Sequence, residues 1–144
     1  GASIKDGGTY VNMEGPQFST LAESQLYRSW GMDVVGMTQM NEARLAREAE
    51  MCYATLCLIT DFDCWHEAET GETVSVEAIM QVLEQNTATA QNVIREAIPL
   101  IAQPSECPCA DALYGSIITY PEVWPADTIE KLKPILEKYQ QGSK

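Results

Sequence analysis

The feature that most constrains the fold is the nearly continuous apolar run at residues 53–60, YATLCLIT. A strand with so few polar positions has no face that is suited to water, so it is expected to be covered on both sides. Strands of this kind lie in the middle of parallel or mixed sheets that carry helices on both faces. The run therefore predicts an α/β domain in which residues 53–60 form a buried central strand.

The segments before this run alternate between strand and helix patterns. Residues 8–13 are strand-like, and residues 34–37 are a short apolar run suited to a buried strand. Between them, residues 20–23 read TLAE, a capping box that predicts a helix ending at Gly31. Asn41 is positioned to cap a second helix. The order strand, helix, strand, helix, strand is typical of α/β proteins.

The segments after the run predict mainly helix. Residues 61–73 are expected to form a polar loop, and Ser75 is expected to cap a long helix that continues to about Ala102. A last helix begins at about Ala126 and should break or restart at Pro134. No internal repeat or low-complexity linker divides the chain, which predicts a single domain.

Charge and composition restrict the classes of partner. The 144 residues include 9 Lys and Arg against 21 Asp and Glu, a formal net charge of -12, which argues against nucleic acid and anionic membranes as partners. A phosphate bound here would need most of its cationic anchors from elsewhere. No stretch approaches the roughly 20 apolar residues of a membrane span, and the first residues lack a signal-peptide core, so we expect a cytoplasmic protein.

The five cysteines fit no common zinc-ligand pattern, because they occur as CYATLC, an isolated Cys64 and CPC. Buried free thiols are the expected state, and no metal site is predicted. A structural pairing that involves Cys107 or Cys109 is the alternative.

Candidate site residues follow the three predicted strands, because ligands of open α/β sheets bind beyond the carboxyl ends of the strands. Asp61 and Asp63 are two residues apart, so in extended chain both point to one side, and joint burial would raise at least one pKa. A neutral acid of this kind can protonate a leaving ring nitrogen. The alternatives are a solvated acidic loop and a non-specific cation-binding site.

The loops after the first two strands contribute an aromatic and a Met-Thr pair. Phe18 can stack on a flat ring, and Thr38 offers a hydroxyl and a backbone donor to an oxyanion. Met37 can pack against a sugar. The alternatives are core positions for Phe18 and Met37 and a turn or cap role for Thr38. No role is assigned to His66, the only histidine.

Four stretches carry a family resemblance that covers residues 7 to about 80: GGTYVNMEGPQFSTLAES, YRSWGMDVVGMT, EAEMCYATLCLITDFDCWHE and TVSVEAI. In them the chain closely resembles the 5'-methylthioadenosine phosphorylases of the purine nucleoside phosphorylase family. The resemblance implies a mixed central sheet flanked by helices. Farther on the likeness is weaker, and CPC resembles a Cys-X-Cys feature of archaeal members.

The resemblance also implies roles for individual residues. Phe18 would stack on the purine, and Met37 would lie against the ribose. Thr38 resembles a phosphate-contacting threonine. Asp61 and Asp63 resemble the acids that recognise the adenine amino group and N7.

Two further features bear on the choice of substrate. The inosine- and guanosine-cleaving relatives carry Asn at the position of Asp61 and Glu at that of Ser19, so this chain resembles the enzymes for 6-amino purines. Val76, Ile79 and Met80 share one helix face and resemble the apolar wall around the 5'-alkylthio group.

The activity implied is phosphorolysis of 5'-methylthioadenosine to adenine and 5-methylthioribose 1-phosphate, a pentosyltransferase reaction without a cofactor in which phosphate is the co-substrate. Family members are roughly twice as long, and their amino-terminal half supplies a phosphate-binding loop, an Arg-His pair and a threonine. Residues 1–144 are therefore expected to be the carboxyl-terminal part of one domain in a split or cleaved enzyme, with the other half as a separate chain.

The complete unit is expected to be a trimer or hexamer. Two alternatives remain for the function. One is a purine or methylthioinosine phosphorylase, and the other is a non-catalytic nucleoside-binding module.

Overall fold

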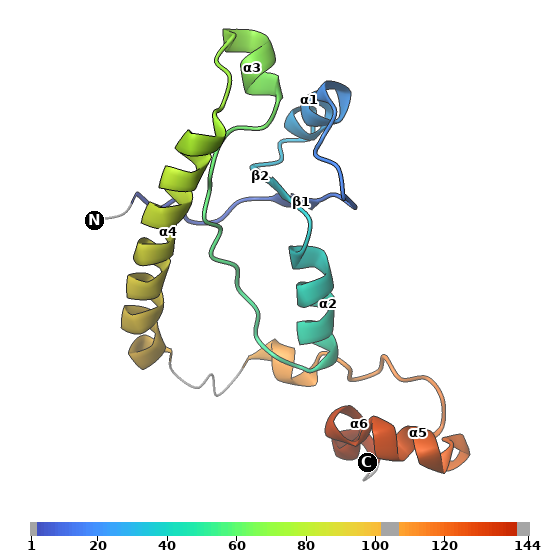
Figure 1. The fold of residues 1–144 in the computed structure, drawn as a ribbon. Helices are drawn as coiled ribbons and strands as arrows, with labels where there is room; N and C mark the ends of the chain where they lie inside the picture. The colour runs from blue at the N-terminus through green and yellow to red at the C-terminus, as the bar shows by residue number, and fades with distance from the viewer. Residues whose placement is uncertain (1–2, 102–106, 141–144) are drawn as a thin grey trace. The chain divides into compact units, whose positions relative to one another are not determined.

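The computed structural model describes residues 3–101 and 107–140, which form helices, one short sheet and coil (Figure 1). The chain divides into two compact units. The first unit contains the described parts of Gly1–Met40 and Thr55–Gln103, and the second contains those of Asn41–Ala54 and Pro104–Lys144.

The sheet of the first unit consists of two parallel strands, β1 (Tyr10–Asn12) and β2 (Val34–Gly36), paired in the register Tyr10↔Val34. Both lie inside the segments predicted to be strands. Helices and a small sheet thus occur together, as the α/β prediction requires.

Helix α1 (Leu21–Ser29) connects the two strands and confirms the predicted capping box. The Thr20 hydroxyl accepts a hydrogen bond from the Glu23 amide at 3.3 Å, and the Glu23 carboxylate accepts one from the Thr20 amide at 2.8 Å. The two bonds satisfy N–H groups that a helix start leaves free. The Thr20 backbone N–H also holds the pKa of Glu23 below its ordinary value.

Helix α2 (Gln39–Glu48) begins two residues before Asn41, so the prediction that Asn41 caps this helix is wrong. The side-chain oxygen of Asn12 instead accepts a hydrogen bond from the Met40 amide at 3.2 Å. Asn12 is the last residue of β1, so the end of a strand supplies the acceptor that the helix start needs.

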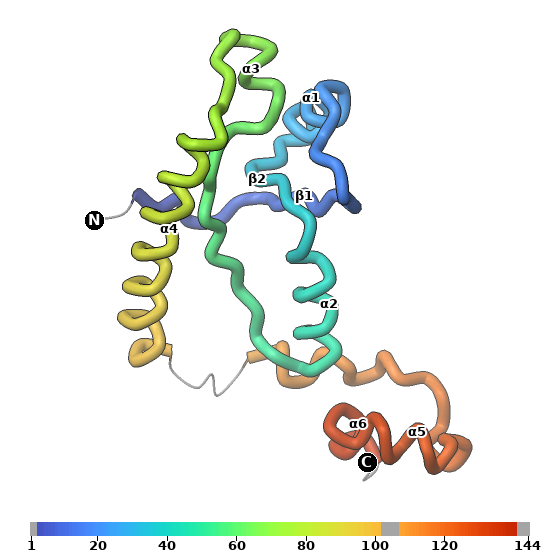
Figure 2. Tube along the Cα trace, in the orientation of Figure 1, coloured from blue at the N-terminus to red at the C-terminus, as the bar shows by residue number. Residues whose placement is uncertain are grey.

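Residues 53–60, predicted to form a buried central strand, pair with no strand in the described part of the chain (Figure 2). Leu56 and Ile59 are 49% and 55% exposed. The backbone does contact α4, because the Asn86 side chain donates to the Ile59 carbonyl at 2.8 Å. The prediction fails for a physical reason. A strand needs hydrogen-bonding neighbours and covering layers, and β1 and β2 pair only with each other.

The segment predicted to be a polar loop contains helix α3 (Trp65–Thr70), so that prediction is wrong in part. Gly71 ends the helix in the left-handed conformation, with φ 75°, and its N–H donates to the Glu67 carbonyl. Glycine adopts this conformation without the clash that a Cβ would cause.

The long helix α4 (Val76–Ala97) starts as predicted, with the Ser75 hydroxyl accepting from the Ala78 amide at 3.1 Å. A 3-10 turn, Ile98–Leu100, follows it. The α-helix therefore ends earlier than the predicted end at about Ala102, because the chain tightens into this turn at Pro99; Ala102 itself lies outside the described residues.

The second unit ends in two short helices, α5 (Ala126–Lys131) and α6 (Lys133–Gln140). The break between them falls at Leu132, and Pro134 is the second residue of α6, which confirms the predicted restart. Two 3-10 turns precede them, at Pro108–Asp111 and Pro121–Val123.

Glu50 joins the distant segments of the second unit. Its carboxylate accepts hydrogen bonds from the Leu113 amide at 3.2 Å, from the Lys138 ammonium at 3.3 Å and from the Tyr139 hydroxyl. The Tyr139 hydrogen bond is the main reason that the pKa of Glu50 lies below its ordinary value. One carboxylate therefore ties helix α6 and the segment around Leu113 to the chain that follows α2.

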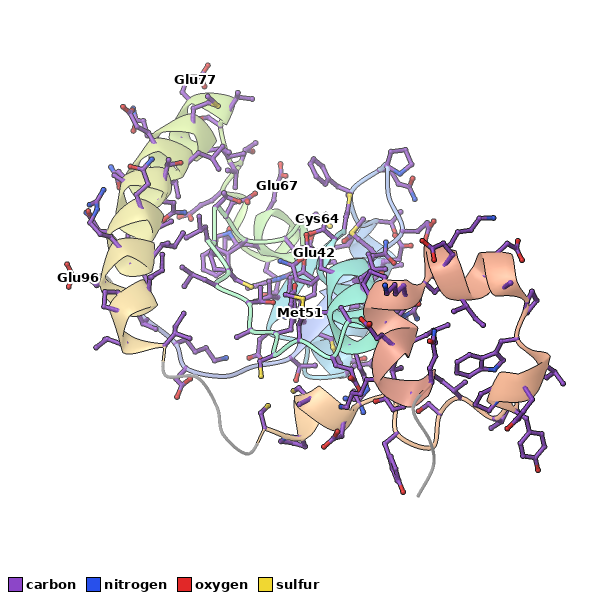
Figure 3. All side chains as sticks on the ribbon, turned by 90° about the horizontal axis from the view of Figure 1, so that it is seen from below. Glu42, Met51, Cys64, Glu67, Glu77 and Glu96 are labelled. Carbon is purple, nitrogen blue, oxygen red and sulfur yellow. The ribbon has the colours of Figure 1, made fainter. Side chains whose placement is uncertain are left out.

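Little of the chain is buried. Among the described residues, Leu136 is the buried apolar side chain and Ser24 the buried polar one. Side chains surround the ribbon on all sides in Figure 3, where the labelled acids Glu77 and Glu96 extend away from helix α4. Over the described ranges, we find no helix with the length and apolar character that a membrane crossing requires.

Candidate functional site

The loops that follow β1 and β2 leave the sheet at the same edge. The Met13 amide, just after β1, donates to the carbonyl of Gly36 at the end of β2 at 2.8 Å. Gly15 has φ 71°, and a Cβ placed on it would lie 2.8 Å from the Met37 sulfur. The first loop therefore packs directly on Met37.

Phe18 and Thr38 extend from these two loops. Phe18 is 86% exposed, so it is not a core residue in this structure, and its ring is accessible for stacking. The hydroxyl of Thr38 donates to the side-chain oxygen of Gln39, the first residue of α2, at 2.8 Å. Thr38 is exposed, and this local bond agrees with the alternative of a role at a helix start.

A third loop joins the first one through Cys64. The Cys64 thiol donates to the Ser19 carbonyl at 3.5 Å. Asp63 holds the same turn, because its carboxylate accepts from the Cys64 amide at 2.9 Å and its carbonyl accepts from the His66 amide at 3.0 Å. Asp63 thus fixes the start of α3.

Aromatic rings and one arginine anchor α3 within the first unit. The rings of Phe62 and His66 are stacked, with centroids 4.5 Å apart and an interplanar angle of 6°. Arg28 of α1 lies over the Trp65 ring at 3.8 Å and forms an ion pair with Glu69 at 2.6 Å. These contacts connect α1 with α3 and so position the loop that carries the two acids.

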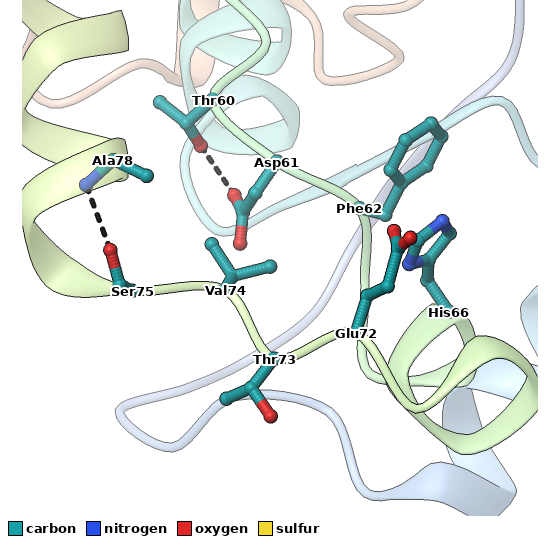
Figure 4. A pocket seen from close by; sticks show the side chains of 9 residues that line it. All are labelled: Thr60, Asp61, Phe62, His66, Glu72, Thr73, Val74, Ser75 and Ala78. Carbon is teal, nitrogen blue, oxygen red and sulfur yellow. Dashed lines mark hydrogen bonds between the residues drawn. The ribbon is translucent and has the colours of Figure 1, made fainter.

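A cavity of about 430 Å³ opens between this loop and the start of α4 (Figure 4). Its volume falls in the range of roughly 300–1,000 Å³ that is usual for small-molecule sites. The Asp61 carboxylate lies at its wall and accepts a hydrogen bond from the Thr60 hydroxyl at 2.6 Å. The lining residues are Thr60, Asp61, Phe62, His66, Glu72, Thr73, Val74, Ser75 and Ala78.

The charge of this wall is acidic. The nine lining residues include Asp61 and Glu72 but no lysine or arginine. A carboxylate wall suits a ligand that presents N–H groups and disfavours an anion such as phosphate. A phosphate at this cavity would need cations from outside its lining.

Neither the two acids nor the apolar face of α4 is covered in the described part of this chain. Asp61 is exposed and Asp63 is half-buried, so the two acids are not buried side by side. Val76 and Met80 are 70% and 60% exposed, and neither they nor Ile79 belong to the residues that line the cavity. The chain offers no layer that covers this face of α4 among its described residues.

Sequence reasoning missed His66 and Glu72 as cavity residues. Both belong to the segment predicted to be loop, and helix α3 brings His66 against the ring of Phe62. The missed signal was Gly71, a typical helix-ending residue that follows six residues able to form a helix.

Comparison with known sequences identifies one protein family. The family model described as Phosphorylase superfamily matches residues 1–99. The S-methyl-5'-thioadenosine phosphorylase of Koribacter versatilis is 54% identical over 139 residues, which are 96% of this chain and 47% of that protein. The enzyme of the same name from Geobacter sulfurreducens is 52% identical and is covered to 48%.

Solved structures agree with these sequence matches. A methylthioadenosine phosphorylase from an antarctic soil metagenomic library has a TM-score of 0.79 and 47% identity, over 90% of this chain and 45% of that one. The methylthioadenosine phosphorylase of Schistosoma mansoni in complex with adenine has a TM-score of 0.59 and 30% identity, over 93% and 40% of the two chains. The nucleoside phosphorylase fold is therefore confirmed, and the chain spans about half the length of the curated relatives it matches.

Proposed function

This chain belongs to the phosphorylase superfamily, and we propose that it is the carboxyl-terminal, base-binding half of a 5'-methylthioadenosine phosphorylase. In the proposed reaction, phosphate captures C1' of the sugar while adenine leaves, which gives adenine and 5-methylthioribose 1-phosphate. The observation that carries the proposal is the position of Asp61 at the wall of a cavity of small-molecule size. Relatives at 52–54% identity that bear this enzyme name support it.

Asp61 and Asp63 are assigned to the purine. A carboxylate accepts hydrogen bonds from the adenine amino group, and a protonated carboxyl donates to N7 as negative charge develops on the leaving base. General acid assistance is worth about 100- to 10,000-fold in rate, so removal of the N7 acid should cost about 3 to 5 kcal/mol of transition-state stabilisation. The exposure of Asp61 in this chain means that the water-excluding cover must come from outside it.

Three residues on the neighbouring loops are assigned to the rest of the nucleoside. Phe18 stacks on the purine, which agrees with its exposed ring. Met37 lies against the ribose, and its contact with the loop at Gly15 supports this placement at the strand ends. Thr38 contacts phosphate through its hydroxyl and its backbone N–H.

The face made by Val76, Ile79 and Met80 is assigned to the 5'-methylthio group. These residues begin α4 immediately after Val74 and Ser75, which line the cavity around Asp61. An apolar face that is exposed here would lose water when a thioether and a covering layer pack on it.

The proposal requires an amino-terminal half, supplied as a separate chain in a split or cleaved enzyme. Among the described residues, Leu136 is the buried apolar side chain, whereas Leu56 and Ile59 of the apolar run are 49% and 55% exposed. Exposed apolar side chains of this kind are typical of a surface that a partner covers. The apolar run at residues 53–60 is exposed and is the natural place for a pairing strand.

The amino-terminal half is also proposed to supply the cations that bind phosphate. The acidic cavity needs cations from outside its described lining, and the proposed partner supplies them. Phosphate is the co-substrate, and no cofactor or metal is assigned to the reaction. The complete unit is proposed to be a trimer or hexamer in the cytoplasm, which gel filtration and cell fractionation would test.

The test compares substrates in the two-half assembly. The chain is co-expressed with the amino-terminal half of the Koribacter versatilis relative, and the assembly receives phosphate with methylthioadenosine or inosine. Preferential release of adenine supports the proposal. A preference for inosine would favour the purine phosphorylase, and nucleoside binding without phosphorolysis would favour a binding module.

A further inference from the structure

The second unit brings together three cysteines that are far apart in the sequence. The sulfur atoms of Cys52, Cys107 and Cys109 all lie within 4.8 Å of one another. Cys52 and Cys107, which are 55 residues apart, have their sulfurs 3.0 Å from each other. All five cysteines of the chain are free thiols that are exposed or half-buried, so the expectation of buried thiols is wrong for this structure.

We propose that Cys52, Cys107 and Cys109 form a three-thiolate site for a thiophilic metal ion, with Zn²⁺ as the ion that fits best. The site goes beyond the proposed phosphorolysis and shares no residue with the cavity around Asp61. Linear spacing could not reveal it, because CPC supplies only two ligands and the third comes from another part of the sequence.

The separations of the sulfur atoms suit a metal. A Zn–S bond of about 2.3 Å in tetrahedral geometry places neighbouring sulfurs about 3.8 Å apart. The sulfurs of Cys52 and Cys107 are 3.0 Å apart, and all three sulfurs lie within 4.8 Å of one another, so rotation of these side chains suffices to reach that spacing. Thiolates are also the ligands that soft ions prefer.

Local structure holds the ligands in place. Cys107 and Cys109 flank Pro108, the first residue of a 3-10 turn, and Pro108 restricts the backbone between them. Cys52 lies two residues after Glu50, whose carboxylate accepts a hydrogen bond from the Leu113 amide at 3.2 Å. This bond ties the segment that carries Cys52 to the one that carries the Cys-Pro-Cys turn.

A hydrogen bond joins the sulfur atoms of Cys52 and Cys107. Thiols give up their protons when they bind a metal ion, so zinc binding at this cluster would release protons.

A second cavity supplies room for a fourth ligand. It measures about 260 Å³ and includes Cys109 in its wall. Arg47 lines the same cavity, and its positive charge offsets the net negative charge of Zn²⁺ with three thiolates. Water can complete the tetrahedron from this side.

The test measures zinc binding by the full 144-residue chain in the assembly in which it purifies, under a phosphine reductant. Competition with a chromophoric chelator should give one Zn²⁺ per chain. Cys52→Ser and Cys109→Ser should each weaken binding by at least about 10-fold, since loss of a supporting residue alone costs 10- to 100-fold. Cys57→Ser is the matched control, because Cys57 lies outside the cluster and should leave binding unchanged.

Cobalt gives an independent count of the ligands. The sulfur-to-cobalt charge-transfer absorption should show three thiolates in the parent chain and two in either cluster variant. Binding below one ion per chain, or equal affinity in Cys52→Ser and the parent chain, would overturn the proposal. So would a Cys52–Cys107 disulfide in peptide maps of protein that was purified and alkylated without reductant. None of these readouts depends on phosphorylase activity.

Discussion

Replacing Asp61 by asparagine should change the choice of base rather than the fold. The Asp61 carboxylate lies at the wall of the cavity and accepts from the Thr60 hydroxyl at 2.6 Å. Asparagine has nearly the same shape and retains an oxygen for this bond, but it offers the ligand an N–H in place of an oxygen. The variant should therefore lose affinity for a 6-amino purine and gain it for a 6-oxo purine.

The expected change in substrate preference follows from the loss of one hydrogen bond to a charged group, which is worth about 1.5 to 3 kcal/mol. The ratio of kcat/KM for methylthioadenosine to that for methylthioinosine should fall by about 10- to 150-fold in Asp61→Asn. The assay follows phosphate-dependent release of adenine and hypoxanthine by the assembly of both halves.

Asp127→Asn is the control for this experiment, because it removes the same charge from α5 at a side chain that is 71% exposed. Its substrate ratio should equal that of the parent enzyme. Equal losses on both substrates in Asp61→Asn would refute the assignment of this residue to the base.

Three other predictions test the wall, the buried hydroxyl and the carboxylate of the second unit. Val76→Ser should lower kcat/KM for methylthioadenosine by an amount worth roughly 1 kcal/mol more than the loss for adenosine, since one methyl-sized group loses its apolar contact. Equal losses on both substrates would mean that this helix face does not contact the 5' group. Ser24 is 1% exposed and its hydroxyl has no partner in the described structure, so Ser24→Ala should leave the free energy of unfolding unchanged or raise it by up to about 1 kcal/mol. A clear loss of stability in thermal melts would contradict this. The pKa of Glu50 is lowered on folding, so the stability that its carboxylate contributes is complete above the ordinary pKa of 4.5 and is lost as pH falls through the lower folded value. Thermal melts at decreasing pH should show this loss in the parent chain and not in Glu50→Gln.

Local sequence signals predicted the elements that depend on nearby residues. The capping box at Thr20, the cap at Ser75 and the restart at Pro134 all formed, because each depends on atoms within a few residues. The misses involve partners that are distant or outside the chain. Asn41 was displaced as a cap by Asn12, which is close only after β1 and β2 pair.

The same distinction applies to the candidate site. Strand-end reasoning predicted that the loops after β1 and β2 lie together, because pairing of the two strands brings their ends to one edge. Asp61 follows a segment that is not a strand here, and its role stays a prediction. The burial expected for residues 53–60 and for the acid pair requires covering layers that this chain does not provide in its described part. The cysteine cluster required a contact across 55 residues, which spacing alone does not encode.

Adenine release by separated and combined halves tests the central proposal most directly. The chain and the amino-terminal half of the Koribacter versatilis relative are purified apart and given methylthioadenosine and phosphate, alone and mixed. Either half alone should release little adenine, whereas the mixture should release adenine in a phosphate-dependent way and elute as a larger oligomer. A mixture whose halves co-elute but release no adenine would contradict it, as would a chain that runs alone as a monomer and melts cooperatively.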